Sequence, residues 1–470
     1  MKLWSFSFGV CALACQAPSA SSTKPATELA ASSAVAAPSV AAPAAVSSQA
    51  QSAAPAARVP GNVLLLTVDS LRSDMPWTGY PRSIAPNLEA LSKASTMYPR
   101  AYSISSYTAK SLPGLLAGRY PSSLYRSGWF FASFPDANLF FPELLQKQGS
   151  RTMALHAHLY FDRGKGINQG FDEWQLVEGL TFNATTDKAV TSDKLTDKAI
   201  ALLSNPENTK QPFFLWSHYM DPHDEYKKHS ESPDFGKTNR DRYDSEVFFT
   251  DLHIGRLLDF ARKQAWFQNT SIIITADHGE AFGEHGMYKH AFELWDVLTH
   301  VPLIIFTPGA TPRIIDERRS AIDLAPTILE LMGAKLPADL MGKSLVPELH
   351  GEKPENREPI FLDLPEDRNC GDRHAILAGD YKLIVQNFGA IKLLFNLKTD
   401  PGELTDLRKR EPAKFTEMLA LYDKTVQGMP IIEPFGGMKL ASGKTARGPE
   451  GPAAAAGVAT SPAASAKKQP

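Results

Sequence analysis

The sequence predicts an α/β fold, in which a large, mostly parallel sheet is flanked by helices and followed by a small C-terminal α+β subdomain. Three observations predict this fold. Short apolar runs alternate with helical patterns along most of the chain, as in sheets covered by helices on both faces. Two of these runs end directly in an aspartate, as buried parallel strands do at the edge where ligands bind. After about residue 356, short strand-like runs follow one another closely.

In chain order, the predicted strands are short runs rich in Val, Ile, Leu and Phe. They are Val63–Val68, Thr152–Leu155, Phe213–Trp216, Ile272–Thr275, Leu303–Phe306 and Ile360–Leu362. Between them, helical periodicity covers about Pro86–Ser95, Asp193–Leu203, Glu246–Gln264 and Ile322–Met332. A polar block, Ser103–Pro121, indicates a loop that enters a short helix stopping at Gly118. A hydroxyl at the start of such a helix faces free N–H groups and the positive end of the helix dipole.

The predicted catalytic domain spans residues 59–355, and the C-terminal subdomain spans residues 356–436. In the subdomain, short antiparallel strands are expected at His374–Leu377, Tyr381–Gln386 and Ala390–Phe395, with a terminal helix over Ala413–Thr425. No internal repeat is present in the sequence.

Both ends of the chain have a different composition. Residues 1–19 carry Lys2 and then an apolar run, which indicates an export signal. Leu13-Ala14-Cys15 favours a lipoprotein signal with a lipidated Cys15, and cleaved soluble export or no export are the alternatives. Residues 20–58 and 437–470 are mostly Ala, Ser, Pro and Thr with other small or polar residues, and are predicted to be a disordered linker and tail. The expected location is therefore the periplasm or cell envelope.

Composition excludes several function classes. The net charge is −2 at pH 7 and the sequence pI is about 6.6, so no basic surface for nucleic acid is expected. Only Cys370, of three cysteines, lies in the predicted folded part, so a disulfide framework or a Cys-x-x-Cys metal site is excluded there. After the signal, no run of 18 uninterrupted apolar residues indicates a transmembrane helix.

Metal-ligand residues follow two of the predicted strands. Val63–Val68 leads into Asp69, and Ile272–Thr275 leads through Ala276 into Asp277-His278-Gly279-Glu280. Because the carboxyl ends of parallel strands meet at one edge of a sheet, these side chains are expected to lie together. Carboxylates with one imidazole suit a divalent ion. The sequence therefore predicts one metal site.

The chain resembles the sulfatase family, within the alkaline phosphatase superfamily. The resemblance runs in family order from about residue 59 to residue 426. It rests on Asn62–Asp69, Ala85–Leu88, Leu115–Pro121, His218–His223 and Asp277–Gly286, with Val301–Ile305, Ile322–Thr327 and Tyr381–Ile384. It implies an alkaline phosphatase/sulfatase-like fold and an ester-hydrolysing enzyme.

The resemblance implies a ligand set of Asp69, Asp277 and His278, completed by the side-chain oxygen of Thr108. Sulfatases usually have a second aspartate where this chain has Ser70, and often an asparagine where it has His278. Ser70 lowers the number of carboxylate oxygens available to the ion, and His278 offers a nitrogen in place of an oxygen. Both departures favour Mn or Zn over Ca. Phosphonate monoester hydrolases and phosphoethanolamine transferases have a similar Asp/Glu, Asp, His set.

The same resemblance places the nucleophile at Thr108. Sulfatases use Cys or Ser in Cys/Ser-x-Pro-x-Arg, which is matured to formylglycine, but here Lys110 and Leu112 replace the Pro and Arg. Threonine is the residue that phosphoethanolamine transferases have at this position. A sulfated threonine lacks the aldehyde route for expelling sulfate, whereas a phosphothreonine can be resolved by water or by a second alcohol.

By resemblance, His223 binds the transferred group or protonates the leaving oxygen, and His290 is a second catalytic residue. Lys110, Lys289 and His218 are candidates for substrate binding, with a structural role as the alternative for His218. These residues predict a hydrolase or transferase for a sulfate or phosphate ester, with phospho-ester chemistry favoured. A sulfuric ester hydrolase proper and a non-catalytic binding protein with the same fold are the alternatives. Substrate identity and oligomeric state are left open by the sequence.

Overall fold

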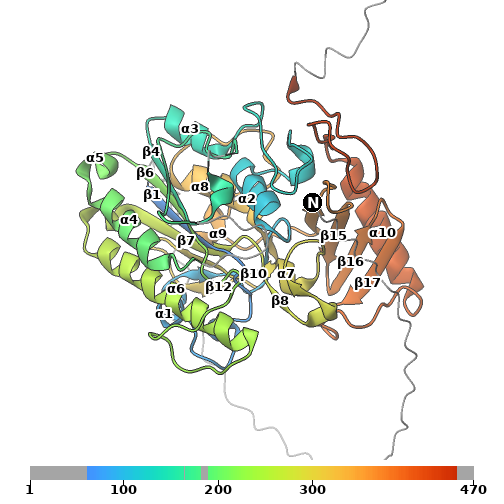
Figure 1. The fold of residues 1–470 in the computed structure, drawn as a ribbon, viewed down its shortest axis with the longest axis horizontal. Coiled ribbons are helices and arrows are strands. Elements are labelled where there is room, and N and C mark those ends of the chain that lie inside the picture. The colour runs from blue at the N-terminus through green and yellow to red at the C-terminus, as the bar shows by residue number, and fades with distance from the viewer. Residues whose placement is uncertain (1–60, 163–164, 181–188, 453–470) are drawn as a thin grey trace, which may run out of the picture. The chain divides into compact units, whose positions relative to one another are not determined.

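An eight-stranded sheet forms the centre of the computed structural model, which describes residues 61–162, 165–180 and 189–452 (Figure 1). The strand order is β12-β2-β11-β7-β1-β6-β4-β5. Their bounds are β1 Asn62–Val68, β2 Thr96–Met97, β4 Arg151–His156, β5 Glu173–Leu176, β6 Phe213–Tyr219, β7 Thr270–Ala276, β11 Leu303–Phe306 and β12 Arg313–Ile314. Of these pairings, only those of β11 with β7 and β2 are antiparallel, so the predicted mostly parallel sheet is confirmed.

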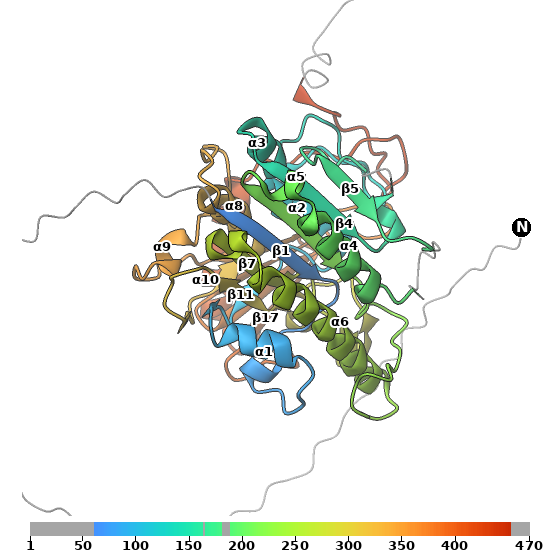
Figure 2. The same ribbon diagram turned by 90° about the vertical axis from the view of Figure 1, so that its left-hand side faces the viewer.

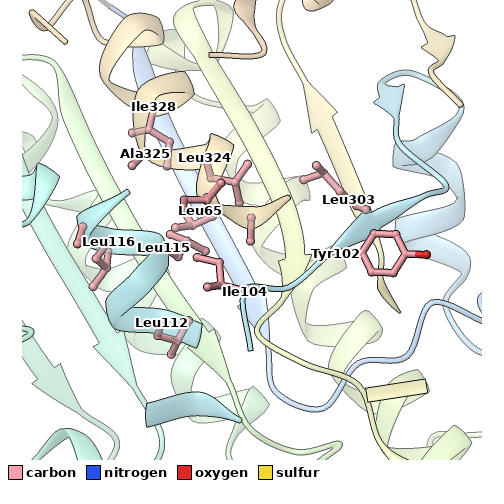
Figure 3. Close-up of a cluster of buried hydrophobic side chains, with 14 of the residues drawn as sticks. Leu65, Tyr102, Ile104, Leu112, Leu115, Leu116, Leu303, Leu324, Ala325 and Ile328 are labelled. Carbon is pink, nitrogen blue, oxygen red and sulfur yellow. The ribbon is translucent and has the colours of Figure 1, made fainter. Parts of the chain in front are cut away.

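Alternate side chains of the central strands enter two separate hydrophobic cores, because successive residues of a strand point to opposite faces. Leu64 and Leu66 of β1 pack in one core, whereas Val63 and Leu65 pack in the other. Both faces of β1 are therefore dry, which explains why its sequence is a continuous apolar run. Figure 3 shows Leu65 beside leucines from two helices in the second core.

Helices cover both faces of the sheet, and the two longest of those on it, α4 Ser192–Ser204 and α6 Asn239–Arg262, lie on the same face (Figures 1 and 2). That face also carries α1 Pro86–Ser92. The opposite face carries α2 Thr108–Ala117, α3 Phe141–Lys147 and α8 Leu324–Leu331. Short helices are α5 Pro206–Thr209, α7 Asp296–Thr299 and α9 Val346–Leu349.

Two small sheets complete the large unit. One has the order β10-β3-β13, with bounds β10 His300–Val301, β3 Ala101–Tyr102 and β13 Arg319–Ser320. The other pairs β8 Ala281–Phe282 with β9 Tyr288–Lys289, directly after the Asp277-His278 segment. This hairpin returns the chain toward the edge at which β7 ends.

The C-terminal subdomain is a separate antiparallel sheet with one helix, as predicted (Figure 1). Its strands are β14 Ile360–Leu364, β15 Arg373–Ala378, β16 Tyr381–Gln386 and β17 Ile391–Asn396, and its helix is α10 Pro412–Gln427. Met418 of α10 is buried against this sheet. The subdomain and the large sheet belong to one compact unit.

The structure corrects the predicted start of the tail. Residues 437–452 have defined positions, and Leu440 and Ala446 are buried although the segment is rich in small residues. The Ala441 N–H donates to the carbonyl of Asp367 at 2.9 Å, which fixes the segment to the subdomain. The predicted signal (1–19), the linker (20–58), Cys15 and the rest of the tail lie outside the described residues. Within the described part, no helix is long and apolar enough to cross a membrane.

Candidate active site

Three adjacent central strands bring the predicted metal ligands to one edge of the sheet. β1 lies between β6 and β7, with Val68 opposite Tyr219 on one side and Ala276 on the other. The residues that follow, Asp69 after β1 and Asp277 after β7, therefore emerge side by side. Both carboxylates are at most 1% exposed. The structure thus assembles the expected pair of acids.

Thr108 joins them from the opposite direction, as the first residue of α2. Its hydroxyl donates to Asp69 Oδ2 at 3.0 Å and lies 3.2 Å from His278 Nε2. The helix N-terminus leaves free N–H groups and a positive dipole around this oxygen. Gly118 ends the helix in the left-handed conformation (φ 61°), as the sequence predicted. The predicted nucleophile is therefore in contact with the predicted ligands.

The ring of His278 is oriented to present a lone pair to the site. Its Nδ1 lies 2.9 Å from the carbonyl of Gly279, which can only accept, so Nδ1 carries the proton and Nε2 does not. Nε2 is 3.4 Å from Asp277 Oδ2 and 3.7 Å from Asp69 Oδ1. A Cβ at position 279 would lie 2.1 Å from the Val297 carbonyl oxygen, which explains why glycine follows this histidine.

The electrostatics of the two carboxylates fit a bound cation. Burial, and then the neighbouring Asp69, raise the pKa of Asp277 to about 7. Burial opposes ionisation of Asp69 as well, but the nearby His223 and His278 hold the pKa of its carboxyl well below the usual range. Asp277 Oδ2 is buried and has no hydrogen-bond partner among the described residues. A divalent ion would satisfy this oxygen and neutralise the like charges.

His218 of β6 supports Asp69 from behind. The Trp216 indole donates to Thr67 Oγ1 at 2.9 Å, and Thr67 Oγ1 lies 2.8 Å from His218 Nδ1. His218 Nε2 lies 3.4 Å from Asp69 Oδ2 and has no hydrogen-bond partner among the described residues. Ligand atoms of Asp69, His218 and Asp277 also lie within 4.8 Å of one another, so this histidine is an alternative ligand. His218 was also a candidate for substrate binding. Its side chain is fully buried and does not line the cavity, which agrees with the alternative, structural role.

His290 lies over the site on a loop with unusual backbone angles. Its ring stacks on His278 at 4.2 Å, and its Nδ1 is 3.3 Å from the buried Glu280 carboxylate. Burial alone would lower the pKa of His290, but Glu280 raises it to about 9, so the ring is charged at neutral pH. Lys289, Ala291 and Phe292 have positive φ values between 61° and 70°, a strained conformation that is common at functional sites.

His223 and Lys289 line the same cavity as Thr108 and His290. The His223 ring is 5.0 Å from that of His290, and its Nδ1 donates to the Asp224 carbonyl at 3.0 Å. Lys289 Nζ lies 2.7 Å from Asp224 Oδ2, in an ion pair that holds the lysine at the rim. The structure thus brings together four of the predicted catalytic and substrate-binding residues.

Lys110 is placed differently from the prediction that it binds substrate. Lys110 is a residue of α2 and is fully buried. Its Nζ lies 3.5 Å from Asp367 Oδ2 and 5.7 Å from the centroid of the Tyr107 ring. Tyr107 donates to the same carboxylate oxygen at 2.7 Å. Burial lowers the pKa of Lys110 to about 8. Lys110 therefore supports the residue before the nucleophile rather than lining the cavity.

The cavity itself has a volume of about 470 Å³ and is lined largely by aromatic rings that sequence reasoning missed. Tyr107 stacks on Phe130 at 4.4 Å, and Phe130 stacks on Phe292 at 5.6 Å. Tyr160, Phe131, His158 and Asn369 complete much of the remaining wall. The Trp129-Phe130-Phe131 run was the one signal in the sequence that could have indicated this wall.

Comparison with known proteins identifies the family whose sequence pattern this chain matches. Residues 61–334 match the sulfatase family, and residues 283–426 match the C-terminal region of N-sulphoglucosamine sulphohydrolase. The chain is 23% identical to the N-acetylglucosamine-6-O-sulfatase of Bacteroides thetaiotaomicron, over 78% of this chain and 86% of the relative.

Two solved structures have the same fold as this chain. One is a complex with its substrate D-glucosamine-2-N,6-O-disulfate (TM-score 0.65, 19% identity, 78% of this chain and 98% of the other). Another is the phosphonate monoester hydrolase of Agrobacterium radiobacter (TM-score 0.64, 18% identity, 78% and 95%). At these identities the likeness shows the fold.

Proposed function

The chain belongs to the sulfatase family and is a sulfatase-like ester hydrolase, and we propose that Thr108 is its nucleophile, acting on a phosphorus ester in preference to a sulfate ester. The observation that carries this proposal is the Thr108 hydroxyl, 3.0 Å from Asp69 and 3.2 Å from His278 at the start of α2. A structural N-cap threonine would need no such contacts with two buried ligand-type residues.

We propose that Asp69, Asp277, His278 and Thr108 hold one divalent ion, with Zn or Mn favoured over Ca. The unsatisfied oxygen of Asp277 and the lone pair of His278 Nε2 support this set. His218 would act as a positioning residue for Asp69. When bound, the ion would neutralise the carboxylates and stabilise both the ionised hydroxyl and the anionic group under attack.

The side chains suggest how the reaction proceeds. The Thr108 hydroxyl gives its proton toward Asp69 Oδ2, and Thr108 Oγ1 forms a bond to phosphorus as the bond to the leaving oxygen breaks. The charged His290 ring holds an anionic oxygen of the substrate, since its pKa of about 9 keeps it protonated at neutral pH. His223, which lines the same cavity, is the proposed proton donor to the leaving oxygen. Water, or a second alcohol in a transferase, then gives its proton to His223 and attacks phosphorus, the bond to Thr108 Oγ1 breaks, and the proton on Asp69 returns to that oxygen.

Threonine itself favours phosphorus over sulfur. Lys110 and Leu112 stand where the family's formylglycine motif has Pro and Arg, so the aldehyde that expels sulfate is not formed by that route. A phosphothreonine needs no aldehyde, because a nucleophile can attack phosphorus directly. The ligand set with His278 resembles that of phospho-transfer members of the superfamily.

A second candidate function is hydrolysis of sulfate esters without formylglycine. The names of the relatives favour it, because the N-acetylglucosamine-6-O-sulfatase matched over most of the chain is a sulfatase. In that case water would attack the sulfur of a sulfated Thr108.

The deciding experiment compares p-nitrophenyl sulfate with a p-nitrophenyl phosphodiester and a phosphonate monoester, each with Zn and with Mn. We expect kcat/KM to be at least about tenfold higher for the better phosphorus ester, a barrier difference of about 1.4 kcal/mol. Mass spectrometry of the Thr108 peptide after rapid quenching should find a phosphoryl or phosphonyl adduct. A faster sulfate ester with a sulfated peptide would establish the second candidate.

Two variants control this experiment. Thr108→Ala should abolish turnover of every ester while leaving the melting temperature close to that of the wild type. Thr108→Ser should keep measurable activity, because a hydroxyl remains at the same position. Activity in Thr108→Ala would show that another group is the nucleophile.

We also propose that the protein is exported to the cell envelope, on the evidence of the N-terminal composition. Labelling with a radioactive fatty acid tests the lipoprotein form, since Cys15→Ser would remove the label. Recovery of unlabelled protein outside the cytoplasm would indicate soluble export instead.

A further inference from the structure

A second hollow adjoins the catalytic cavity on the far side of its aromatic wall. It has a volume of about 640 Å³ and is lined chiefly by Trp129, Phe130, Phe131, Lys165, Arg368 and Asn369. Phe130, Phe131 and Asn369 also line the catalytic cavity. The two spaces therefore share one wall, and a molecule that fills the first can extend into the second.

The shared wall favours an apolar or flat body. Tyr107 and Phe130 are stacked with planes 4° apart, and Phe131 meets Phe130 edge-on with ring centroids 5.1 Å apart. These rings offer faces and edges but few polar atoms. An aromatic or otherwise apolar segment of a substrate would therefore bind between the reacting ester and the second hollow.

The charged side chains that line the second hollow are all positive. Arg368 and Lys165 are exposed on its wall, and no carboxylate lines it. No carboxylate lies within ion-pair distance of either cation among the described residues, whereas Arg72, Arg82 and Arg240 on the same chain all have acidic partners.

The guanidinium of Arg368 is also fixed in place. It lies 5.0 Å from the centroid of the Trp129 ring, which is 45% exposed. The Arg368 backbone N–H donates to the Gly128 carbonyl at 2.9 Å, so the two stacked residues are tied together at their backbones. Trp129 thus forms a platform for a cation that has no carboxylate partner in the described part of the chain.

We propose that this hollow is a subsite for a second anionic group on the ester substrate. The inference rests on the proposed function and adds to it a substrate class: an elongated ester whose apolar or aromatic body separates the reacting group from a distal carboxylate, sulfate or phosphate. Arg368 binds the distal group, with Lys165 as the second cation and the Asn369 amide as a neutral partner.

The test uses two biphenyl-4-yl methylphosphonates that differ only at the 4′ position, where one carries a carboxylate and the other a carboxamide. We expect the wild type to prefer the carboxylate about tenfold in kcat/KM, through KM, because the distal group does not touch the reacting atoms. Arg368→Gln should reduce this preference to about twofold or less and leave kcat unchanged. Arg410→Gln, an exposed arginine that lines neither space, is the matched control.

Equal kcat/KM values for the two esters in the wild type would overturn the proposal. So would a preference that survives in the double variant Arg368→Gln/Lys165→Gln. Charge reversal by Arg368→Glu sharpens the result, since it should favour the carboxamide.

A binding arm separates failure of the subsite from failure of the proposed function. Calorimetry compares 4′-hydroxybiphenyl-4-carboxylate with its carboxamide, and neither needs turnover. If no ester reacts but the carboxylate still binds more tightly and loses this advantage in Arg368→Gln, the subsite stands and the proposed chemistry is wrong. If the advantage is lost only in His290→Ala, the carboxylate occupies the catalytic centre and the subsite is refuted.

Discussion

The hydrogen bonds of the two rings distinguish the histidines that could bind metal. His278 donates from Nδ1 to a carbonyl and leaves the lone pair of Nε2 facing both carboxylates. In His218, Nδ1 contacts the Thr67 hydroxyl, and Nε2 lies 3.4 Å from Asp69 Oδ2. We propose His278 as the ligand and His218 as the residue that orients Asp69.

We expect this difference to appear in metal content. After dialysis, His278→Gln should retain little Zn, whereas His218→Gln should still bind close to one ion per chain with an affinity about 10–100-fold weaker. Elemental analysis and competition with a chelator measure the two effects. Loss of the ion in His218→Gln with retention in His278→Gln would reverse the assignment.

Metal affinity should also depend on pH through Asp277. Its pKa is raised to about 7 by burial and by Asp69, so below pH 7 a bound ion must displace a proton. The apparent affinity should therefore fall by up to about tenfold per unit as the pH decreases from 7 to 5, and become flat above about 8. Chelator competition at a series of pH values measures this, and a pH-independent affinity would contradict it.

The buried Lys110 should make stability depend on pH. Its pKa falls from 10.5 in the unfolded chain to about 8 in the fold, so the unfolded state holds more protons between these values. Stability from this group therefore rises as the pH increases from 8 to 10.5, by at most about 3 kcal/mol. Lys110→Met lacks this dependence. Urea unfolding of both proteins at pH 7.5 and 10 should show that the free energy of unfolding of the wild type increases relative to that of Lys110→Met. The same difference in free energy at both pH values would contradict this prediction.

At the scale of elements, helix α1 depends on a neighbour for its N-terminus. Its own N-cap residue, Ala85, provides no side-chain hydrogen bond. Instead Asp251 of α6 accepts from the backbone N–H groups of Asn87 (2.9 Å) and Leu88 (2.8 Å). The two helices on that face of the sheet are therefore joined through one carboxylate.

Removing this cap should destabilise the protein measurably. Asp251→Ala should cost about 1–3 kcal/mol because buried N–H groups lose their acceptor, and Asp251→Asn less because one oxygen remains. Asp259→Ala, an exposed position on the same helix, is the matched control and should change stability by no more than about 0.5 kcal/mol. Denaturant unfolding decides between them, and equal losses at the two positions would show that the cap contributes nothing.

Elements with a strong local signal were predicted well. β1, β7 and β11 are continuous apolar runs, and their bounds agree with prediction to within two residues. The prediction of α6 began seven residues late, since its first turns are polar and its capping box at Thr238 and Asp241 was overlooked. β5 was missed because it has only four residues and lies at the edge of the sheet.

The residues of the candidate site could be placed from sequence for a similar reason. Asp69, Asp277 and His278 each follow a recognisable strand, and Thr108 begins a recognisable helix. The aromatic wall could not be placed, because Phe130, Phe292 and Asn369 lie on three loops that meet only in the folded chain. Lys110 was placed wrongly because its partner, Asp367, lies in the other part of the chain.

At the scale of the whole molecule, the segment after α10 stabilises the site from outside. Met438, Leu440 and Ala446 pack so closely on Gly128 that a Cβ there would lie 2.7–3.1 Å from them. The Gly128 N–H also donates to the Phe435 carbonyl at 3.0 Å. The segment therefore supports the loop that carries Trp129 and Phe130.

Truncation should distinguish this segment from the chain that follows it. Deleting residues 453–470 should leave the melting temperature unchanged, as the composition predicts for that part. Deleting residues 437–470 should lower it by about 1–2 °C, the shift expected for roughly 1 kcal/mol in a protein of this size. Differential scanning calorimetry measures both, and deletion of the predicted linker, residues 20–58, serves as a control. Equal melting temperatures for the two C-terminal deletions would show that the segment contributes nothing.

The hydrogen bond between Tyr107 and Asp367 joins residues 260 positions apart in the chain. During synthesis the proposed nucleophile, Thr108, emerges early, but the carboxylate that accepts from its neighbour Tyr107 emerges only with the last quarter of the polypeptide. Asp367 is in turn held by Ala441, which emerges later still. A chain that ends before Asp367 thus carries the proposed ligands and the proposed nucleophile, yet lacks this hydrogen bond. Tyr107 therefore gains its buried acceptor only when the polypeptide is close to complete.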